Sequence, residues 1–174
     1  MAKIIYTDLK KCMGCKSCEL ACAIAHSRSK NLLAALMEET KPLSRVKVVS
    51  TEGVAVPIQC MHCEDSPCVR ICPTRALSRP AGVDHILFRR EFCIGCHSCV
   101  LVCPFGAAQQ RGSEIVRCDL CIDRLEGGEK PACIIACPVA CRTLVSSEEV
   151  AARKRRAAAA EMKKGLEAKA PARD

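Results

Sequence analysis

The chain has 174 residues, which is enough for one compact domain or two small ones. It contains one tyrosine, three phenylalanines and no tryptophan, so a conventional aromatic-rich core is excluded. The formal net charge is +8, of which residues 151–174 contribute +5, from eight Lys or Arg against three Asp or Glu. No apolar run approaches the roughly 18 residues of a transmembrane helix. The N-terminal sequence MAKIIYTDLK has no apolar signal segment, so we expect a cytoplasmic location.

Four short β units, one of them a two-stranded hairpin, are predicted in chain order, and a group of cysteines follows each unit. The sequence Glu52-Gly53 between two apolar segments is typical of a hairpin turn. Each cysteine group is expected to form a loop followed by a short helix, so the repeating unit is strand, loop, helix. The predicted strands are Lys3–Tyr6, the hairpin Val46–Val49 with Val54–Val56, Ile86–Phe88 and Glu114–Val116.

Sixteen of the seventeen cysteines form four runs of four. The first and third runs have the spacing C-x2-C-x2-C-x3-C of bacterial ferredoxins, and the second and fourth lengthen only the middle gap, to four and eleven residues. Each iron of a [4Fe–4S] cluster needs one terminal thiolate, so the runs predict four [4Fe–4S] clusters. In two-cluster ferredoxins the last cysteine of a run ligates the other cluster, which predicts two interlocked pairs of runs. The runs are Cys12, Cys15, Cys18, Cys22; Cys60, Cys63, Cys68, Cys72; Cys93, Cys96, Cys99, Cys103; and Cys118, Cys121, Cys133, Cys137.

Cysteines in such numbers have two other common uses in proteins. A disulfide framework requires an oxidising compartment, which the N-terminus does not indicate. Zinc also binds paired C-x2-C elements, and a zinc-dependent nucleic-acid-binding module using Arg153–Arg156 is the distant alternative. Zinc sites, however, have no use for the third and fourth cysteine of each run. Four oxidised clusters with their thiolates would carry about −8, which offsets the formal charge, so the basic composition does not indicate nucleic-acid binding.

The predicted fold class is α+β, with two bacterial-ferredoxin-like modules and a C-terminal helical tail. The outer module comprises residues 1–45 plus 104–145 and holds runs one and four. The inner module comprises residues 46–103 and holds runs two and three, and residues 146–174 form the basic, Ala-rich tail. Gly14 and Gly95 lie inside the first C-x2-C of their runs, where we expect a positive φ that tightens the turn.

Three segments outside the runs have their own predictions. Leu20–Ala25 is apolar enough to continue as a helix into residues 31–39. Within Ser27–Lys41, apolar residues at helical spacing predict a lid over a cluster, with a partner-recognition helix as the alternative. The gap between Cys121 and Cys133 contains Gly127-Gly128 and predicts a solvated loop. The apolar residues of the lid are Leu32, Leu33, Leu36 and Met37.

The tail is predicted to be a helix that begins with a capping box. Ser146 and Glu149 have the S-x-x-E spacing, and the helix should run to about Gly165. Arg153–Arg156 lie near its start, which is unfavourable for positive charge because the helix dipole is positive there. The tail is either a solvated helix or a docking arm for an acidic partner or an anionic membrane surface.

A few residues near the runs need a separate interpretation. Cys141, the seventeenth cysteine, occupies a position that is alanine in two other runs, so we interpret it as a packing residue and not a ligand. His26 either couples a proton to a reduced cluster or is an ordinary hydrogen-bonded histidine. His62 and His97 lie in cysteine loops and His85 on a predicted strand, and none is needed as a ligand. The chain has no P-loop, G-x-G-x-x-G or G-x-S-x-G motif, so we expect a non-catalytic protein.

The motifs CMGCKSCELAC, CMHCEDSPCVRIC, CIGCHSCVLVC, and CDLC with CIIAC resemble those of the four-cluster ferredoxin-like electron-transfer subunits that serve DMSO reductase, formate dehydrogenase and hydrogenase complexes. The resemblance covers residues 3–145 and implies a ligand set for each cluster. It assigns Cys12, Cys15, Cys18 and Cys137 to cluster 1; Cys118, Cys121, Cys133 and Cys22 to cluster 2; Cys60, Cys63, Cys68 and Cys103 to cluster 3; and Cys93, Cys96, Cys99 and Cys72 to cluster 4.

Within that family, the stretch ELACAIAHSRSKN resembles the iron–sulfur partner of nickel carbon monoxide dehydrogenase. This implies that the chain passes electrons from that enzyme to a hydrogenase, an NAD(P) oxidoreductase or another acceptor in an oxygen-poor cytoplasm. The alternative is an electron-transfer subunit of a molybdenum or tungsten reductase, a formate dehydrogenase or a hydrogenase. From the charge balance we expect no nucleic-acid partner, and association with a membrane surface stays open.

Overall fold

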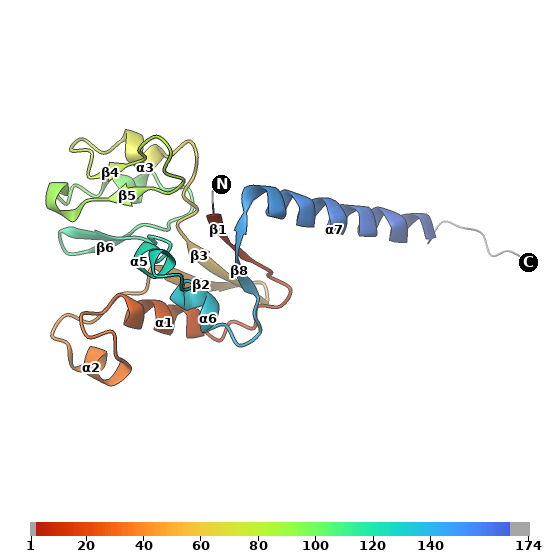
Figure 1. The fold of residues 1–174 in the computed structure, drawn as a ribbon, viewed down its shortest axis with the longest axis horizontal. Helices are drawn as coiled ribbons and strands as arrows, with labels where there is room; N and C mark the ends of the chain where they lie inside the picture. The colour runs from red at the N-terminus through yellow and green to blue at the C-terminus, as the bar shows by residue number, and fades with distance from the viewer. Residues whose placement is uncertain (1–2, 168–174) are drawn as a thin grey trace, which may run out of the picture.

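The structure, a computed structural model, describes residues 3–167. It contains short helices and four separate two-stranded antiparallel sheets, from which one long C-terminal helix projects (Figure 1). The strands are β1 Lys3–Thr7, β2 Val46–Thr51, β3 Val54–Gln59, β4 Leu77–Ser78, β5 Leu87–Phe88, β6 Gln109–Arg111, β7 Glu114–Val116 and β8 Arg142–Ser146. The helices are α1 Ser17–Ala25, α2 Leu32–Met37, α3 Pro67–Arg70, the 3-10 helix η1 Arg90–Phe92, α4 Ser98–Leu101, α5 Ile122–Glu126, α6 Ala132–Ile135 and α7 Ser147–Glu167.

The pairing of strands brings the ends of the sequence together. β1 pairs with β8, with Lys3 opposite Ser146 and Thr7 opposite Arg142. The other three sheets are local pairs: β2 with β3, β4 with β5, and β6 with β7. Because β1 precedes the first cysteine run and β8 follows the fourth, their pairing places these two runs side by side. The helix contacts show the same pairing of runs. Helix α1 of the first run packs against α6 of the fourth, and α3 of the second run contacts α4 of the third.

Buried residues form two hydrophobic cores. The first joins Ile5 and Val46 to cysteines of runs one and four, and the second joins Leu77, Ile86 and Ile115 to cysteines of runs two and three. Cysteine side chains belong to both cores, in the places that aromatic residues would occupy in a larger domain. Val46, in the hairpin β2–β3, is the first residue of the predicted inner module, but it packs in the first core beside cysteines of runs one and four. The two predicted modules are therefore not packed independently.

Helix α1 ends earlier than the sequence predicts. The expected continuation from Leu20–Ala25 into residues 31–39 is wrong, because the Ser27 hydroxyl donates to the Ile24 carbonyl at 2.7 Å and accepts from the Lys30 amide. Lys30 has φ +51°, which a helix cannot accommodate. Asn31 then caps a new helix, α2, by accepting from the amides of Leu33 and Ala34.

The predicted role of α2 as a packed lid is also wrong. Leu32, Leu33, Leu36 and Met37 are all exposed, and within α2 only Ala35 is buried. The Cys121–Cys133 gap is not a loop throughout, since α5 occupies its first part. His85 lies on a bend just before β5 and not on a strand.

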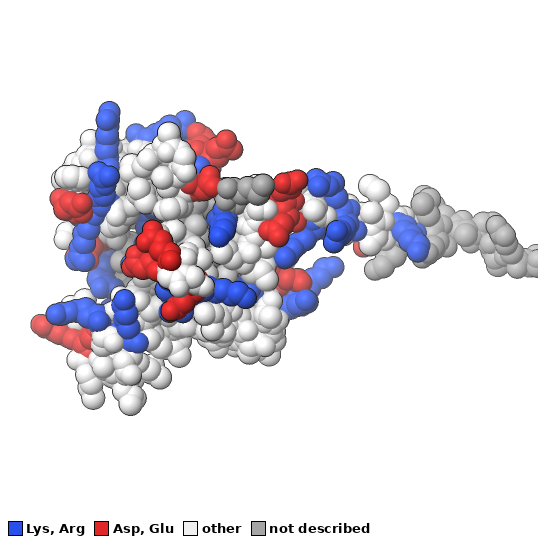
Figure 2. Space-filling view, viewed as in Figure 1, with Lys and Arg blue, Asp and Glu red and all other residues white. Residues whose placement is uncertain are grey.

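The predicted capping box of α7 is confirmed. The Ser146 amide donates to Glu149 Oε2 at 2.7 Å, and the Glu149 amide donates to Ser146 Oγ at 3.2 Å. Acidic side chains stand at the start of α7 and basic ones follow (Figure 2). Arg153 is held by the body of the protein, because it donates to Thr143 Oγ1 and lies 5.5 Å from the centre of the Tyr6 ring. These contacts explain an arginine so close to a helix N-terminus.

Candidate metal centres

All four cysteine runs use the same backbone turn. The second residue after the first cysteine of each run has a positive φ, between +49° and +70°, and these residues are Gly14, His62, Gly95 and Leu120. The prediction for the two glycines is confirmed, and the other two runs adopt the turn with a bulky residue. A residue in this conformation turns successive amide groups toward one concavity, which favours an anionic ligand. The Leu120 amide accordingly donates to Cys118 Sγ at 3.4 Å.

The structure brings the cysteines predicted for cluster 1 around one small cavity. Cys12, Cys15 and Cys18 line it from the first run, and Cys137 lines it from the fourth. Cys141 also borders this cavity, with its sulfur 3.4 Å from that of Cys137. Five sulfurs therefore border this cavity, one more than the four predicted ligands.

The cysteines predicted for cluster 4 line a second cavity. Cys93, Cys96 and Cys99 come from the third run and Cys72 from the second. The positions match those at the first cavity: three cysteines of one run and the last cysteine of its partner.

Three cysteines predicted for cluster 2, Cys22, Cys118 and Cys133, pack together in the first hydrophobic core. Burial raises the pKa of the Cys118 thiol, and Cys133 and Cys22 raise it further. Burial likewise raises the pKa of Cys133 to about 11, with contributions from Cys22 and Cys121. In the inner runs, burial raises the pKa of Cys63 and Cys68, and both also interact with Cys60 and Cys103.

This donor set fits an iron–sulfur cluster. All seventeen cysteines, which lie within residues 12–141, are free thiols. Crowded, buried thiols resist losing their protons, and a metal that binds thiolates removes this penalty, which is how metal binding stabilises such folds.

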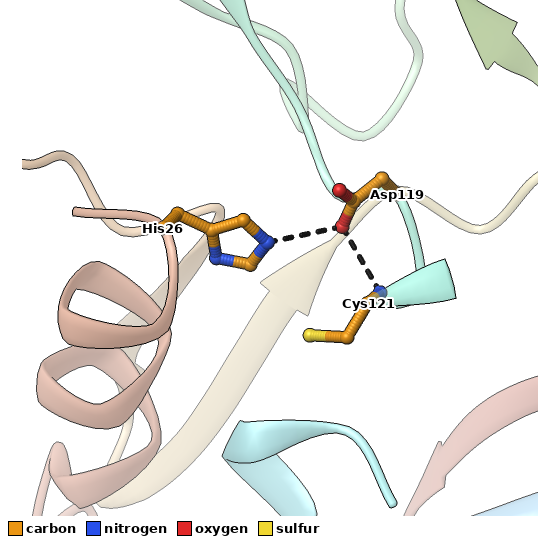
Figure 3. Close-up of side chains that lie close together, drawn as sticks. All are labelled: His26, Asp119 and Cys121. Carbon is orange, nitrogen blue, oxygen red and sulfur yellow. Dashed lines mark hydrogen bonds and ion pairs between the residues drawn. The ribbon is translucent and has the colours of Figure 1, made fainter. Parts of the chain in front are cut away.

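A hydrogen-bonded group of residues lies beside the predicted cluster 2, and Figure 3 shows three of its members, His26, Asp119 and Cys121. His26 Nε2 lies 3.2 Å from Asp119 Oδ1, the same oxygen accepts from the Cys121 amide, and Arg45 pairs with the other carboxylate oxygen. His26 Nδ1 is 2.7 Å from the Cys22 carbonyl oxygen and 3.7 Å from Cys22 Sγ. Burial opposes protonation, but hydrogen bonds with Asp119, Cys121 and Cys22 raise the pKa of His26 to about 12. His26 is thus a hydrogen-bonded histidine, one of its two predicted interpretations.

His26, Asp119 and Cys121 could also hold a single metal ion, because their ligand atoms lie within 4.8 Å of one another. Cys121, however, is one of the cysteines of the fourth run. We therefore regard this group as the surroundings of the cluster site and not as a separate centre.

Sequence reasoning missed two buried arginines. Arg117 is 5% exposed and donates to Cys60 Sγ at 2.9 Å and to the Ile86 carbonyl at 3.1 Å. Arg142 is 1% exposed and lies 3.7 Å from Cys133 Sγ. The available signal was the internal repeat: Arg142 is five residues after Cys137, where the second run has the apolar Leu77.

Two family models match this chain. Residues 51–147 match the 4Fe-4S dicluster domain, and residues 9–23 match a 4Fe-4S binding domain. The chain is 42% identical over 149 residues to an iron-sulfur protein of Rhodospirillum rubrum, with 78% of this chain and 77% of the relative covered.

Two Escherichia coli K12 proteins are also similar. The putative electron transport protein YsaA is 38% identical, covering 86% of this chain and 94% of the relative. The electron transport protein HydN is 35% identical, covering 90% and 97%. Within residues 3–167 no helix is both long and apolar enough to cross a membrane. The chain therefore belongs to the 4Fe-4S dicluster family of ferredoxin-like, iron–sulfur electron-transport proteins.

Proposed function

We propose that this chain carries four [4Fe–4S] clusters and passes electrons between two redox proteins without catalysing a reaction itself. The ligand sets are those given above for clusters 1 to 4, with residues 1–45 plus 104–145 as the outer module and 46–103 as the inner one. The observation that carries the proposal is the pair of cavities, each lined by three cysteines of one run and the last cysteine of another. A [4Fe–4S] cluster takes up and releases one electron at a time.

The exposure of the cysteines supports a route through the protein. Cys15 and Cys96 are the two exposed cysteines of the chain, and they belong to the sites proposed for clusters 1 and 4. Electron transfer between proteins needs a cofactor close to the surface. We assign these two faces as the places where electrons enter and leave, with the other two sites between them. Ser17 and Ser98 hydrogen-bond the two exposed thiols and lower the pKa of each, which favours the thiolate that a metal requires.

For the partners, the proposal retains carbon monoxide dehydrogenase as donor and a hydrogenase, an NAD(P) oxidoreductase or another enzyme as acceptor. A molybdenum or tungsten reductase, a formate dehydrogenase or a hydrogenase is the alternative complex. A cytoplasmic location agrees with the number of oxygen-sensitive thiolates. Anaerobic affinity purification of the tagged chain, followed by mass spectrometry, distinguishes these partners. If none of these enzymes co-purifies with the chain, the partner assignment is overturned.

Cluster content tests the central claim. Anaerobically purified protein should contain about sixteen iron and sixteen sulfide per chain, and dithionite should produce the EPR signals of reduced [4Fe–4S] clusters. Zinc in place of iron, or about eight iron per chain, would contradict the proposal.

Two matched variants test the ligand sets. Cys15→Ser should damage cluster 1 and leave the inner pair intact, whereas Cys96→Ser should damage cluster 4 and leave the outer pair intact. Both residues are exposed and occupy the same place in their runs, so the variants differ in the site and not in burial. Loss of the same EPR signals in both variants would contradict the pairing.

A further inference from the structure

Arg142 is the first residue of β8 and is the most deeply buried arginine of the described chain, at 1% exposure. Its Nη2 donates to Gln59 Oε1 at 3.0 Å, and Gln59 is itself fixed by donating to the Ile5 carbonyl at 3.3 Å. The other two guanidinium nitrogens, Nε and Nη1, are buried and have no hydrogen-bond partner. Buried N–H groups are almost always satisfied, so these two donors point to an acceptor that is supplied on cofactor binding.

The charge of Arg142 is also uncompensated. Arginine stays protonated in proteins, and among residues 3–163 no carboxylate forms an ion pair with Arg142. An isolated buried charge is costly unless a negative group lies near it. The nearest groups that could carry negative charge are cysteine sulfurs: Cys133 Sγ lies 3.7 Å from Nη2, and Arg142 lines the cavity of the predicted cluster 1 together with Cys18. These cysteines belong to different predicted clusters, cluster 2 and cluster 1.

The internal repeat shows that this position does not require an arginine for folding. Leu77 lies five residues after Cys72, as Arg142 lies five after Cys137, and each begins a short strand. Leu77 is 2% exposed and packs in the second hydrophobic core. The equivalent position is Ser27 in the first run and Ala108 in the third, so the fourth run alone has a cation there.

We propose that Arg142 is a tuning residue that lies between clusters 1 and 2 and raises the reduction potential of both. This inference rests on the proposed function. Each cluster becomes more negative by one charge when it accepts an electron from the donor protein, and a fixed guanidinium stabilises that reduced form more than the oxidised one. Hydrogen bonds and nearby charge are established determinants of cluster potential.

Anaerobic redox titration of the holoprotein, followed by EPR, tests this proposal. Arg142→Leu copies the residue found in the other half, and Arg142→Gln removes the charge but keeps N–H donors. Both should shift two of the four one-electron equilibria toward the oxidised form by at least tenfold, which equals 59 mV for a one-electron couple. Arg142→Lys, which keeps the charge, should stay within threefold of the wild type. Arg156→Leu is the surface control, since Arg156 is exposed on α7, outside the cysteine runs, and its removal should leave all four potentials unchanged.

Iron content, measured on the same samples, separates the two levels of the proposal. Wild-type protein without sixteen iron would overturn the proposed function. Full iron content with unchanged potentials in Arg142→Leu and Arg142→Gln would overturn the tuning role alone. If neither neutral variant takes up iron, the reduction potentials of Arg142→Lys are the deciding measurement. Potentials equal to those of the wild type support the role of charge, and a tenfold shift in two equilibria contradicts it.

Discussion

Gly95 is the backbone position where a single methyl group should do the most damage. Its φ is +69°, and a Cβ at this position would lie 2.5 Å from the Ser113 carbonyl oxygen, an atom of the main chain that cannot rotate away. The left-handed conformation costs a non-glycine residue about 1–2 kcal/mol, and overpacking adds about 1–3 kcal/mol. We therefore expect Gly95→Ala to lower stability by about 2–5 kcal/mol.

Two other glycines separate these contributions. Gly82 has φ +78° with nothing within 4 Å of its Cβ position, so Gly82→Ala reports the backbone cost alone, about 1–2 kcal/mol. Gly14 has φ +70° and a contact of 3.1 Å to the Ala55 Cβ, which can shift slightly, so Gly14→Ala should be intermediate. For a chain of this size about 1 kcal/mol lowers the melting temperature by about 2–4 °C. Thermal melts of anaerobic holoprotein should rank the variants Gly82, Gly14, Gly95 in increasing damage. A Gly95→Ala melt equal to that of Gly82→Ala would refute the steric argument.

Other expectations follow from local contacts. Ser146→Ala should lower the stability of the start of α7 by about 1 kcal/mol, seen as about fivefold faster hydrogen exchange there. The Ser146 amide lowers the pKa of Glu149 below its ordinary value of 4.5, so the contribution of this carboxylate is present above that pH and lost as the pH falls further. The same amides should then exchange relatively faster in acid, and a Glu149→Gln variant should not show this acid response. Leu33→Gln and Met37→Gln on the exposed face of α2 should change stability by less than about 0.5 kcal/mol, and a drop of several degrees in the melt would show hidden packing. Cys141→Ala should retain the wild-type iron content, and loss of one cluster's iron would make Cys141 a ligand.

The cysteine spacing could be interpreted from the sequence because the ligand geometry is local. Three of the four thiols predicted for each site come from one run, within a short loop in the first three runs, and a glycine marks the turn in two runs. The capping box at Ser146 is equally local. The strand β8 was not predicted, because its five residues become a strand only by pairing with β1 at the other end of the sequence. The end of α1 was missed for a different reason: the Ser27 side chain, and not a glycine or proline, closes the helix.

The buried arginines show the limit of pattern reading most clearly. A hydrophobicity pattern assigns charged residues to the surface, because an unpaired charge in a protein core is normally costly. That rule assumes that the core consists only of protein. Here Arg142 lies beside Cys133 and Arg117 beside Cys60, so the cations face sulfur and not carboxylate. Where an anionic cofactor fills the centre, a buried cation at a repeat position that is uncharged in the other runs, as at Arg142, becomes a stabilising choice, and such a residue marks the position where cofactor charge meets the protein.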